Sequence, residues 1–370
     1  MGGFNSFLID FLRIKNTHQV KHLNGELNHY GEIININGQN KTFFLDEIHP
    51  IYLQKKNFHY LKDIANKKNI DSYPSNLGYE TPRYIKKNEV IAKKVEFDCI
   101  ILSTQSNKEN FQLIDFFKKT KTKIILFDKE DHPEVYYNNS IDIYKGFNRE
   151  NFDLFFKQDV PLNNTDNKIY PIAPVPSTIK INLEDYEKIN KDLYHFFFVG
   201  DYRHGVTRSD RIQIIDFLKK NFKKSTLELT IQKKFFLSKE KIEDYLLKSL
   251  INLSPSGKVW CSYRHCELVN YFSPIILPKP NCKTAPGSFE DMKNCIFYET
   301  EFDNDSLNKK DNSGYKIKNI NLFKEKIEYL IENKNMIKDI FFNYYSLIKN
   351  YHTRRARAQY ILNTITSIEK

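Results

Sequence analysis

The sequence predicts an α/β protein with two Rossmann-like domains facing each other across a cleft, followed by a helical tail. Two series of short β-rich runs alternate with helix-like stretches, which is the pattern of sheets with parallel strands. A proline-rich segment separates the two series. The length of 370 residues also exceeds what one hydrophobic core usually serves.

The first series lies before the proline-rich segment. Its predicted elements are a hairpin at 31–45, a helix at 57–69, a strand at 97–104, a helix at 107–122 and a strand at 123–128. The hairpin prediction depends on alternating apolar residues around Asn37 and Gly38. Four prolines interrupt residues 160–180, so we expect a linker there.

The second series follows the linker. We predict strands at 193–200, 225–231, 249–254, 273–278 and 294–299, helices at 212–222 and 238–248, and a helical tail from 321 onward. The domain limits that follow are 1–178 for the N-terminal domain and 179–340 for the C-terminal domain. We expect residues 341–370 to form a C-terminal helix that packs back on the N-terminal domain.

The composition is ordinary for a soluble globular protein, and its lysines, which are spread along the chain, suit either a solvated surface or an anionic partner. The formal net charge is +11, which suits phosphate ligands, nucleic acid or an acidic membrane face. Five cysteines, an odd number, indicate reduced thiols in the cytoplasm. Cys261, His265 and Cys266 lie close together, but no second pair has zinc-ligand spacing, so no metal is expected. No apolar run approaches the roughly 20 residues needed to cross a bilayer.

The most informative stretch is residues 251–280, INLSPSGKVWCSYRHCELVNYFSPIILPKP. An apolar strand ends in a Ser-Pro-Ser-Gly turn, where Gly257 lets the backbone pass close to a ligand. We expect the next helix to begin near Ser262, so that its free backbone N–H groups can bind an anion. Arg264 lies in the first turn and Glu267 shares its face. The alternative is a weak surface ion pair between these two side chains.

This stretch resembles the nucleotide-sugar site of GT-B glycosyltransferases, in particular the group-one and exostosin-like kind with an R-x-x-E element on the helix. The resemblance implies that Glu267 binds the ribose of the donor and that Arg264 meets its diphosphate. It also implies that the loop near the donor consists of Ser256, Gly257 and Lys258.

A second stretch, FFFVGDYRHGVTRSDRIQIIDFL at 196–218, is similar to the entry of the C-terminal domain in the same family. There a strand ends in glycine and an arginine leads into a helix. The resemblance implies that Arg203, His204 and Arg208 line the cleft and meet the pyrophosphate or the leaving nucleotide, with Arg211 in the same basic cluster. The alternative is a solvated loop with stray charges.

A third stretch, KIILFDKEDHP at 123–133, resembles the Asp-rich turn of the N-terminal domain in this family. Transfer of a sugar to a hydroxyl group needs a base, which is usually a carboxylate or a histidine. Asp131 and His132 are therefore the candidate catalytic residues, and Asp128 lies beside them. The alternative for Asp131 is a helix cap or a turn residue.

The sequence departs from the family pattern at three places. Members with paired glutamates carry a second acid where this chain has Val259, which questions the retaining mechanism linked to that pair. The glycine usually found five residues after the ribose glutamate is Phe272 here. The first strand of the N-terminal domain is missing before Gly2, so we expect an abbreviated domain or a misplaced start.

The resemblance implies a cytoplasmic, metal-independent glycosyltransferase of polysaccharide biosynthesis that uses no cofactor. A nucleoside-diphosphate sugar would bind in domain 179–340. The acceptor, a polysaccharide, a lipid-linked glycan or a protein, would bind in domain 1–178. The basic cluster Arg354, Arg355 and Arg357 in the tail is interpreted as packing on the other domain, or as peripheral contact with the inner membrane face.

Three other functions remain open at this point. A nucleotide-sugar epimerase shares the two-domain layout. A basic nucleic-acid-binding protein would account for the charge of +11, but its charge is not clustered and no RNP-like or helix-turn-helix signature occurs, so no nucleic acid is expected. A catalytically inactive scaffold would bind nucleotide without turnover.

Overall fold

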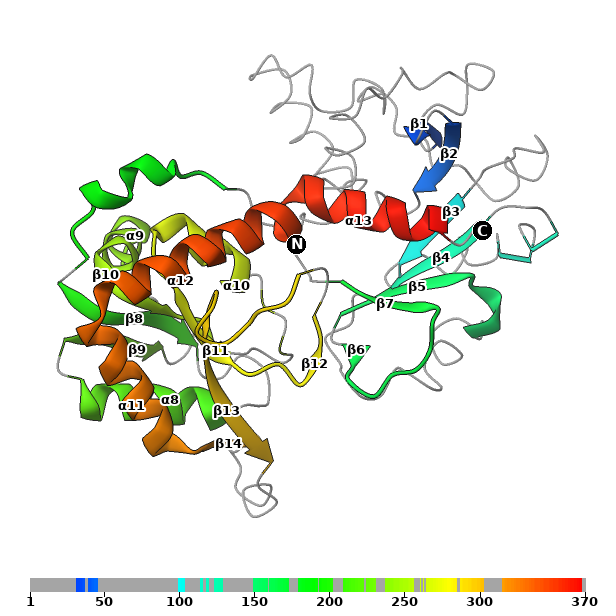
Figure 1. Ribbon diagram of the computed structural model, residues 1–370. Helices are drawn as coiled ribbons and strands as arrows, with labels where there is room; N and C mark the ends of the chain where they lie inside the picture. The colour runs from blue at the N-terminus through cyan, green and yellow to red at the C-terminus, as the bar shows by residue number, and fades with distance from the viewer. Residues whose placement is uncertain are drawn as a thin grey trace. The chain divides into compact units, whose positions relative to one another are not determined.

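The structure is a computed structural model that divides into two compact units (Figure 1). It describes residues 31–36, 39–45, 99–103, 114–115, 118–119, 123–128, 149–158, 160–172, 179–191, 193–201, 209–222, 224–230, 237–255, 260, 262, 264–284, 287–302 and 315–367. The first unit comprises 1–158, 164–172 and 358–370, and the second comprises 159–163 and 173–357. The sequence placed its boundary after residue 178.

The first unit contains a six-stranded sheet with the order β1-β2-β3-β4-β5-β7. Its strands are β1 (Gly31–Ile36), β2 (Gln39–Leu45), β3 (Cys99–Ser103), β4 (Lys123–Asp128), β5 (Leu154–Lys157) and β7 (Ile169–Pro171). β1 and β2 are antiparallel, which confirms the predicted hairpin, and the other neighbours are parallel. Phe127 and Phe156 stack in the core with ring centroids 4.8 Å apart. The predicted helix at 57–69 lies outside the described residues.

The proline-rich segment contains more structure than the predicted linker. β6 (Val160–Pro161) pairs with β12 (Cys282–Lys283), and β7 adds to the edge of the first sheet. Proline lacks a backbone N–H and is tolerated at a strand end or a sheet edge, where Pro171 and Pro161 lie. The predicted linker therefore contains two short strands within residues 160–172, and neither is a central strand of a sheet.

The second unit contains a six-stranded sheet with the order β14-β13-β11-β10-β8-β9. Its strands are β8 (Tyr194–Asp201), β9 (Ser225–Thr230), β10 (Ser249–Leu253), β11 (Ile275–Pro278), β13 (Ile296–Phe302) and β14 (Tyr315–Lys318). All neighbours are parallel except β14, which is antiparallel to β13 at the edge. Counted along the chain, the five parallel strands have the order 2-1-3-4-5 of a doubly wound sheet. The predicted α/β class is confirmed.

Helices cover both faces of this sheet (Figure 1). They are α8 (Ser209–Asn221), α9 (Lys239–Lys248), α10 (Arg264–Glu267), α11 (Ile320–Glu332) and α12 (Lys334–Leu347). Apolar residues of α8 and α11 form one core cluster, and residues of α9 and α10 form a second, while α12 contributes to both. The split follows from the strand order. α8 connects β8 to β9, whereas α9 connects β9 back to β10 in the opposite direction along the sheet, so the right-handed crossovers that such connections favour place the two helices on opposite faces.

Strand β8 shows how the sequence fills both cores. Phe196 and Phe198 belong to one cluster, whereas Phe197 and Val199 belong to the other. Successive strand side chains point to opposite faces, so an unbroken apolar run is what a strand covered on both faces requires. Each such side chain contributes about 1.5–3 kcal/mol on burial.

The tail is helical, as predicted. α11 and α12 are followed by a short π-helix (Ile348–His352) and by α13 (Arg354–Ser367). The first four residues of α13 belong to the second unit, and those from 358 belong to the first. Within the first unit, Tyr360 donates a hydrogen bond to the Pro171 carbonyl at 3.1 Å. None of the helices in the described part of the chain combines the length and apolarity that a bilayer span requires.

Candidate functional site

A pocket of about 200 Å³ lies in the second unit, and α9 forms one of its walls. The side chain of Ser238 caps this helix by accepting a hydrogen bond from the backbone N–H of Lys241. Four residues of α9 line the pocket: Lys239, Ile242, Glu243 and Leu246. Their spacing of i, i+3, i+4 and i+7 places them on one face of the helix.

A second wall is the helical stretch from Arg264 to Tyr271, in which α10 continues as a 3₁₀-helix (Leu268–Tyr271). It lines the pocket with the same spacing, through Arg264, Glu267, Leu268 and Tyr271. The Ser262 hydroxyl accepts a hydrogen bond from the Arg264 N–H at 3.3 Å, so the stretch begins where the sequence predicted. Because its α-helical part has only four residues, an anion here must be held mainly by side chains.

Phe272 ends this helical stretch in the left-handed conformation, with φ 58° and ψ 23°. Helices commonly end with glycine in this conformation, because a side chain there costs about 1–2 kcal/mol. The Phe272 ring is buried against Tyr186 and Phe341. Ring burial therefore offsets the backbone strain at the position where the resembling family has glycine.

Strands β8 and β10 form the floor of the pocket. Phe197, Phe198 and Val199 come from the middle of β8, and Leu253 is the last residue of β10. The helix after β8 packs in one core cluster and the helix after β10 packs in the other. The chain thus turns to opposite faces of the sheet at this point, and such switch points are where open α/β sheets bind ligands.

Arg264 and Glu267 do not form the ion pair that the sequence offered as an alternative. Among the side chains that the structure describes, no salt bridge involves either residue. The Arg264 guanidinium instead lies over the Phe198 ring, 5.1 Å from its centroid, at cation–π distance. Glu267 is exposed at the pocket wall. One cation and one carboxylate therefore line the same pocket without neutralising each other.

His265, which lies between these two residues in the sequence, has a structural role. Its ring is buried, with Nδ1 2.7 Å from the Ser254 Oγ and Nε2 2.7 Å from the Trp260 carbonyl. The Tyr344 hydroxyl donates to the His265 carbonyl at 2.6 Å. The Trp260 indole N–H donates to the Pro278 carbonyl at 2.6 Å. This histidine therefore holds together the chain on both sides of 256–259.

The same contacts bear on the cysteines near His265. Both of its ring nitrogens have protein partners, and Cys261 lies outside the described residues. Burial raises the pKa of the Cys266 thiol to about 11, so this thiol stays protonated. In the described ranges no group of three His, Cys, Asp or Glu residues could hold a metal ion.

Sequence reasoning missed three polar residues of the pocket: Lys239, Glu243 and Tyr271. Burial raises the pKa of Tyr271, and the charges of Glu243 and Glu267 raise it further. Both carboxylates therefore lie near this hydroxyl. The i, i+3, i+4, i+7 spacing on the predicted helix 238–248 is the signal that could have found Lys239 and Glu243.

Most of the other predicted site residues lie outside the described residues: Asp131, His132, Arg203, His204, Arg208, Ser256, Gly257 and Lys258. Arg211 is described, and its guanidinium lies 5.9 Å from the centroid of the Phe198 ring, the ring that Arg264 also covers. Phe198 is thus flanked by two arginines from different helices.

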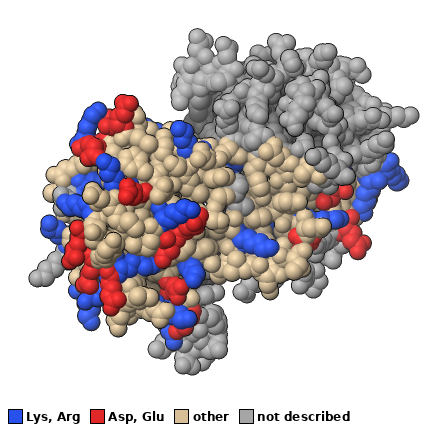
Figure 2. Space-filling view, in the orientation of Figure 1, with Lys and Arg blue, Asp and Glu red and all other residues tan. Residues whose placement is uncertain are grey.

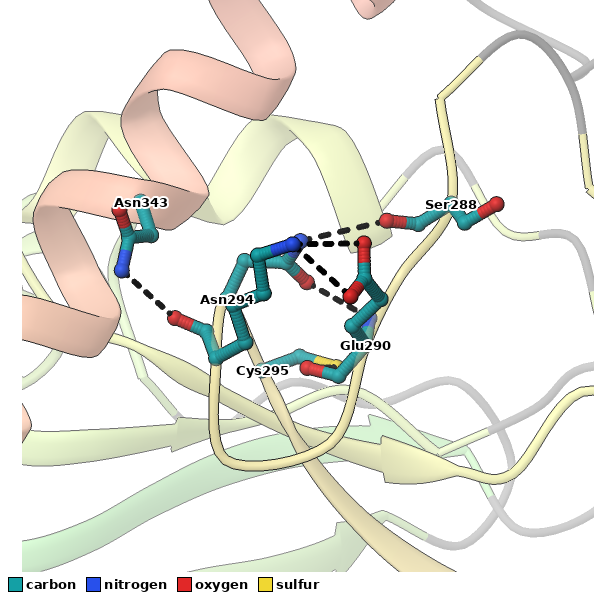
Figure 3. A network of polar contacts seen from close by, with 6 residues as sticks. Ser288, Glu290, Asn294, Cys295 and Asn343 are labelled. Atoms are coloured by element: carbon teal, nitrogen blue, oxygen red, sulfur yellow. Dashed lines mark hydrogen bonds and ion pairs between the residues drawn. The ribbon is translucent and has the colours of Figure 1, made fainter.

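The loop before β13 carries a polar network of its own (Figure 3). Asn294 accepts a hydrogen bond from the Glu290 N–H at 2.9 Å and donates to the Ser288 carbonyl at 3.2 Å. Lys293 pairs with the Glu290 carboxylate, and Asn343 of α12 donates to the Lys293 carbonyl. These groups bond to one another, so we assign the network to loop structure.

Charges on the visible part of the described surface are mixed in sign (Figure 2). Several lysines pair with acidic neighbours one helical turn away, as Lys248 does with Asp244 at 2.7 Å and Lys188 with Asp185 at 2.6 Å. Mixed charge of this kind is typical of a solvated surface.

No protein-family model matches the chain, and no curated protein matches its sequence significantly. Solved structures with a similar course of the chain include a glycosyltransferase from Rickettsia africae. It is 14% identical with a TM-score of 0.49, over 84% of this chain and 88% of that one. Another is Anabaena HepE in complex with UDP, 12% identical with a TM-score of 0.48, over 83% and 89% of the two chains. Similarity this low does not transfer an activity, so function is inferred from the pocket.

Proposed function

We propose that this chain is a glycosyltransferase that moves a sugar from a nucleoside-diphosphate donor to an acceptor hydroxyl group. One observation carries the proposal. Arg264 and Glu267 line a single pocket at the switch point of a doubly wound sheet, and no ion pair between them is found among the described side chains. An arginine and a carboxylate one turn apart suit the diphosphate and the ribose of a nucleotide, respectively.

The two side chains would divide the donor between them. A guanidinium offers a planar fork of N–H donors that suits the oxygens of a diphosphate. The Glu267 carboxylate is an acceptor when ionised and suits the hydroxyl groups of ribose. Ligand pockets commonly measure about 300–1,000 Å³, so a cavity of about 200 Å³ would hold part of the nucleotide.

Transfer also requires stabilisation of the departing diphosphate. In the proposal positive side chains do this without a metal, because fixed charges aimed at a leaving group lower the barrier where water is excluded. The residues proposed for the phosphates and the donor loop, beyond Arg264, are Arg203, His204, Arg208, Ser256, Gly257 and Lys258.

The acceptor half of the reaction is proposed from the sequence. Asp131 or His132 would take the proton of the acceptor hydroxyl. In a GT-B arrangement residues 1–178 would bind the acceptor, a polysaccharide, a lipid-linked glycan or a protein. A protein of this kind would work in the cytoplasm or at the inner membrane face.

Binding of nucleoside diphosphates to the full chain tests the donor site. Titration calorimetry with GDP, UDP, ADP and CDP should find at least one ligand. Glu267→Ala and Arg264→Ala should each weaken it about tenfold to a hundredfold, because a hydrogen bond to a charged group is worth about 1.5–3 kcal/mol. Exposed residues outside the pocket supply matched controls: Glu240→Ala and Lys219→Ala should bind like the parent. Absence of binding by all four nucleotides would remove the proposal.

Turnover separates transfer from the alternatives. A transferase releases free nucleoside diphosphate from a sugar donor, with an acceptor or slowly with water. An epimerase interconverts two nucleotide sugars, and an inactive scaffold binds nucleotide without either change. Chromatography of a donor incubated with the protein resolves these three outcomes, and only the first supports a transferase.

A further inference from the structure

The α9 wall of the pocket presents one cation and one carboxylate side by side. Lys239 and Glu243 are four residues apart, so they share a helix face, and Lys239 Nζ lies 3.8 Å from Glu243 Oε1. Their side chains are 82% and 45% exposed. A loose, solvated pair of this kind contributes little to stability, so a ligand can replace it at little cost.

At the end of the pocket that Tyr271 lines, the nearby carboxylates are those of Glu243 and Glu267. Apart from burial, these two carboxylates are what raise the pKa of Tyr271. Ile242 and Leu246 complete this end with apolar surface. An aromatic hydroxyl, an apolar wall and an ammonium–carboxylate pair together suit a flat heterocycle with a polar edge.

We propose that this end of the pocket binds the base of the donor nucleotide and selects guanine. The inference rests on the proposed function: with the diphosphate at Arg264 and the ribose at Glu267, the base reaches the α9 wall. Guanine presents a carbonyl oxygen followed by two adjacent N–H donors. The Glu243 carboxylate accepts both donors in parallel, and the Lys239 ammonium donates to the carbonyl.

The other bases fit this edge less well. Uracil has one N–H between two carbonyls, so a carbonyl oxygen would face the Glu243 carboxylate. Adenine and cytosine each present a single exocyclic amino group next to an acceptor, which leaves one carboxylate oxygen without a partner. A site built around hydrogen-bond groups rejects ligands that leave those groups unpaired.

Calorimetric titration of the full chain with GDP, UDP, ADP and CDP tests the selection. GDP should bind at least about tenfold more tightly than UDP, the difference expected for a charge-assisted bidentate contact. In Glu243→Gln the amide presents one acceptor and one donor, which suits uracil better than guanine. The affinity for GDP should fall about tenfold in this variant, while the affinity for UDP stays the same or rises. Glu240→Gln, on α9 but outside the pocket, should leave all affinities unchanged.

The outcomes separate the two levels of the proposal. If Glu267→Ala weakens nucleotide binding about tenfold or more but the parent chain binds UDP as tightly as GDP, the donor site stands and the guanine selection is overturned. An equal loss of affinity for all four nucleotides in Glu243→Gln also overturns the guanine selection. If none of the four nucleotides binds the parent chain, the donor site itself is overturned.

Discussion

The two faces of the helical stretch Arg264–Tyr271 differ in whether their polar groups bond to other protein groups. On the inner face, His265 has protein partners for both ring nitrogens and its carbonyl accepts from Tyr344. On the outer face, Arg264 and Glu267 line a pocket and have no ion pair among the described side chains. Buried polar groups are normally satisfied inside the protein, whereas polar groups that serve a ligand are left for the ligand. Within these eight residues, the inner face therefore has a structural role and the outer face forms part of the candidate binding site.

The largest change in the free energy of unfolding is expected for Trp260, which is hydrogen-bonded to His265 on the inner face. Trp260 is 1% exposed, donates to the Pro278 carbonyl and accepts from His265 through its own carbonyl. Trp260→Ala should lower the free energy of unfolding by about 3–5 kcal/mol, measured by urea denaturation, because it removes a large buried ring. Trp260→Phe, which keeps most of the ring, should cost about 1–3 kcal/mol for the unpaired carbonyl. A loss below about 1 kcal/mol for the alanine variant would show that Trp260 is not part of the framework.

The next effect concerns the end of the same stretch, where Lys191 is buried. Its ammonium group donates to the Ser273 hydroxyl at 3.0 Å and to the Tyr271 carbonyl at 3.4 Å. The rings of Tyr186, Phe272 and Phe341 lie within cation–π distance, at 4.9, 5.7 and 5.5 Å. These contacts favour the charged form, yet burial dominates and lowers the pKa of Lys191 to about 6.

This lysine makes stability depend on pH. Between about pH 6 and the ordinary lysine pKa of about 10.4, the unfolded chain binds a proton at Lys191 that the native protein does not. The free energy of unfolding should therefore rise with pH across this window, by up to about 1.4 kcal/mol per pH unit from this group. Lys191→Met should flatten the rise in urea denaturation series from pH 6.5 to 9.5, whereas the exposed Lys219→Met should keep it. Parallel slopes in the parent and Lys191→Met would contradict the assignment.

Apolar runs predicted most strands of the two sheets, because strands covered on both faces need continuous apolar sequence, as in 193–200. They did not predict the short strands β5, β7 and β14. Ser262 marked the start of the helical stretch for a local reason, its capping side chain. Local signals of this kind survive in a single sequence.

Other features could not be read from the sequence because they depend on distant partners. Pro161 and Pro171 suggested a linker, but their strands are completed by Cys282–Lys283 and by β5. The role of Phe272 became clear only with the rings of Tyr186 and Phe341 around it. Glu243 lies 24 residues before Glu267 in the sequence and joins it only through the fold.

The smallest changes in the free energy of unfolding are expected for Glu267 and Arg264 on the outer face. Glu267→Gln should change the free energy of unfolding by less than about 0.5 kcal/mol, because an exposed side chain away from packed features contributes little to stability. Arg264→Gln should cost up to about 1 kcal/mol, the value of its cation–π contact with Phe198. Ser254→Ala serves as the inner-face control and should cost more than the Glu267 variant, because it leaves the buried His265 Nδ1 without its partner. A loss of 2 kcal/mol or more in Glu267→Gln would show that the carboxylate is structural, and the distinction between the two faces would fail.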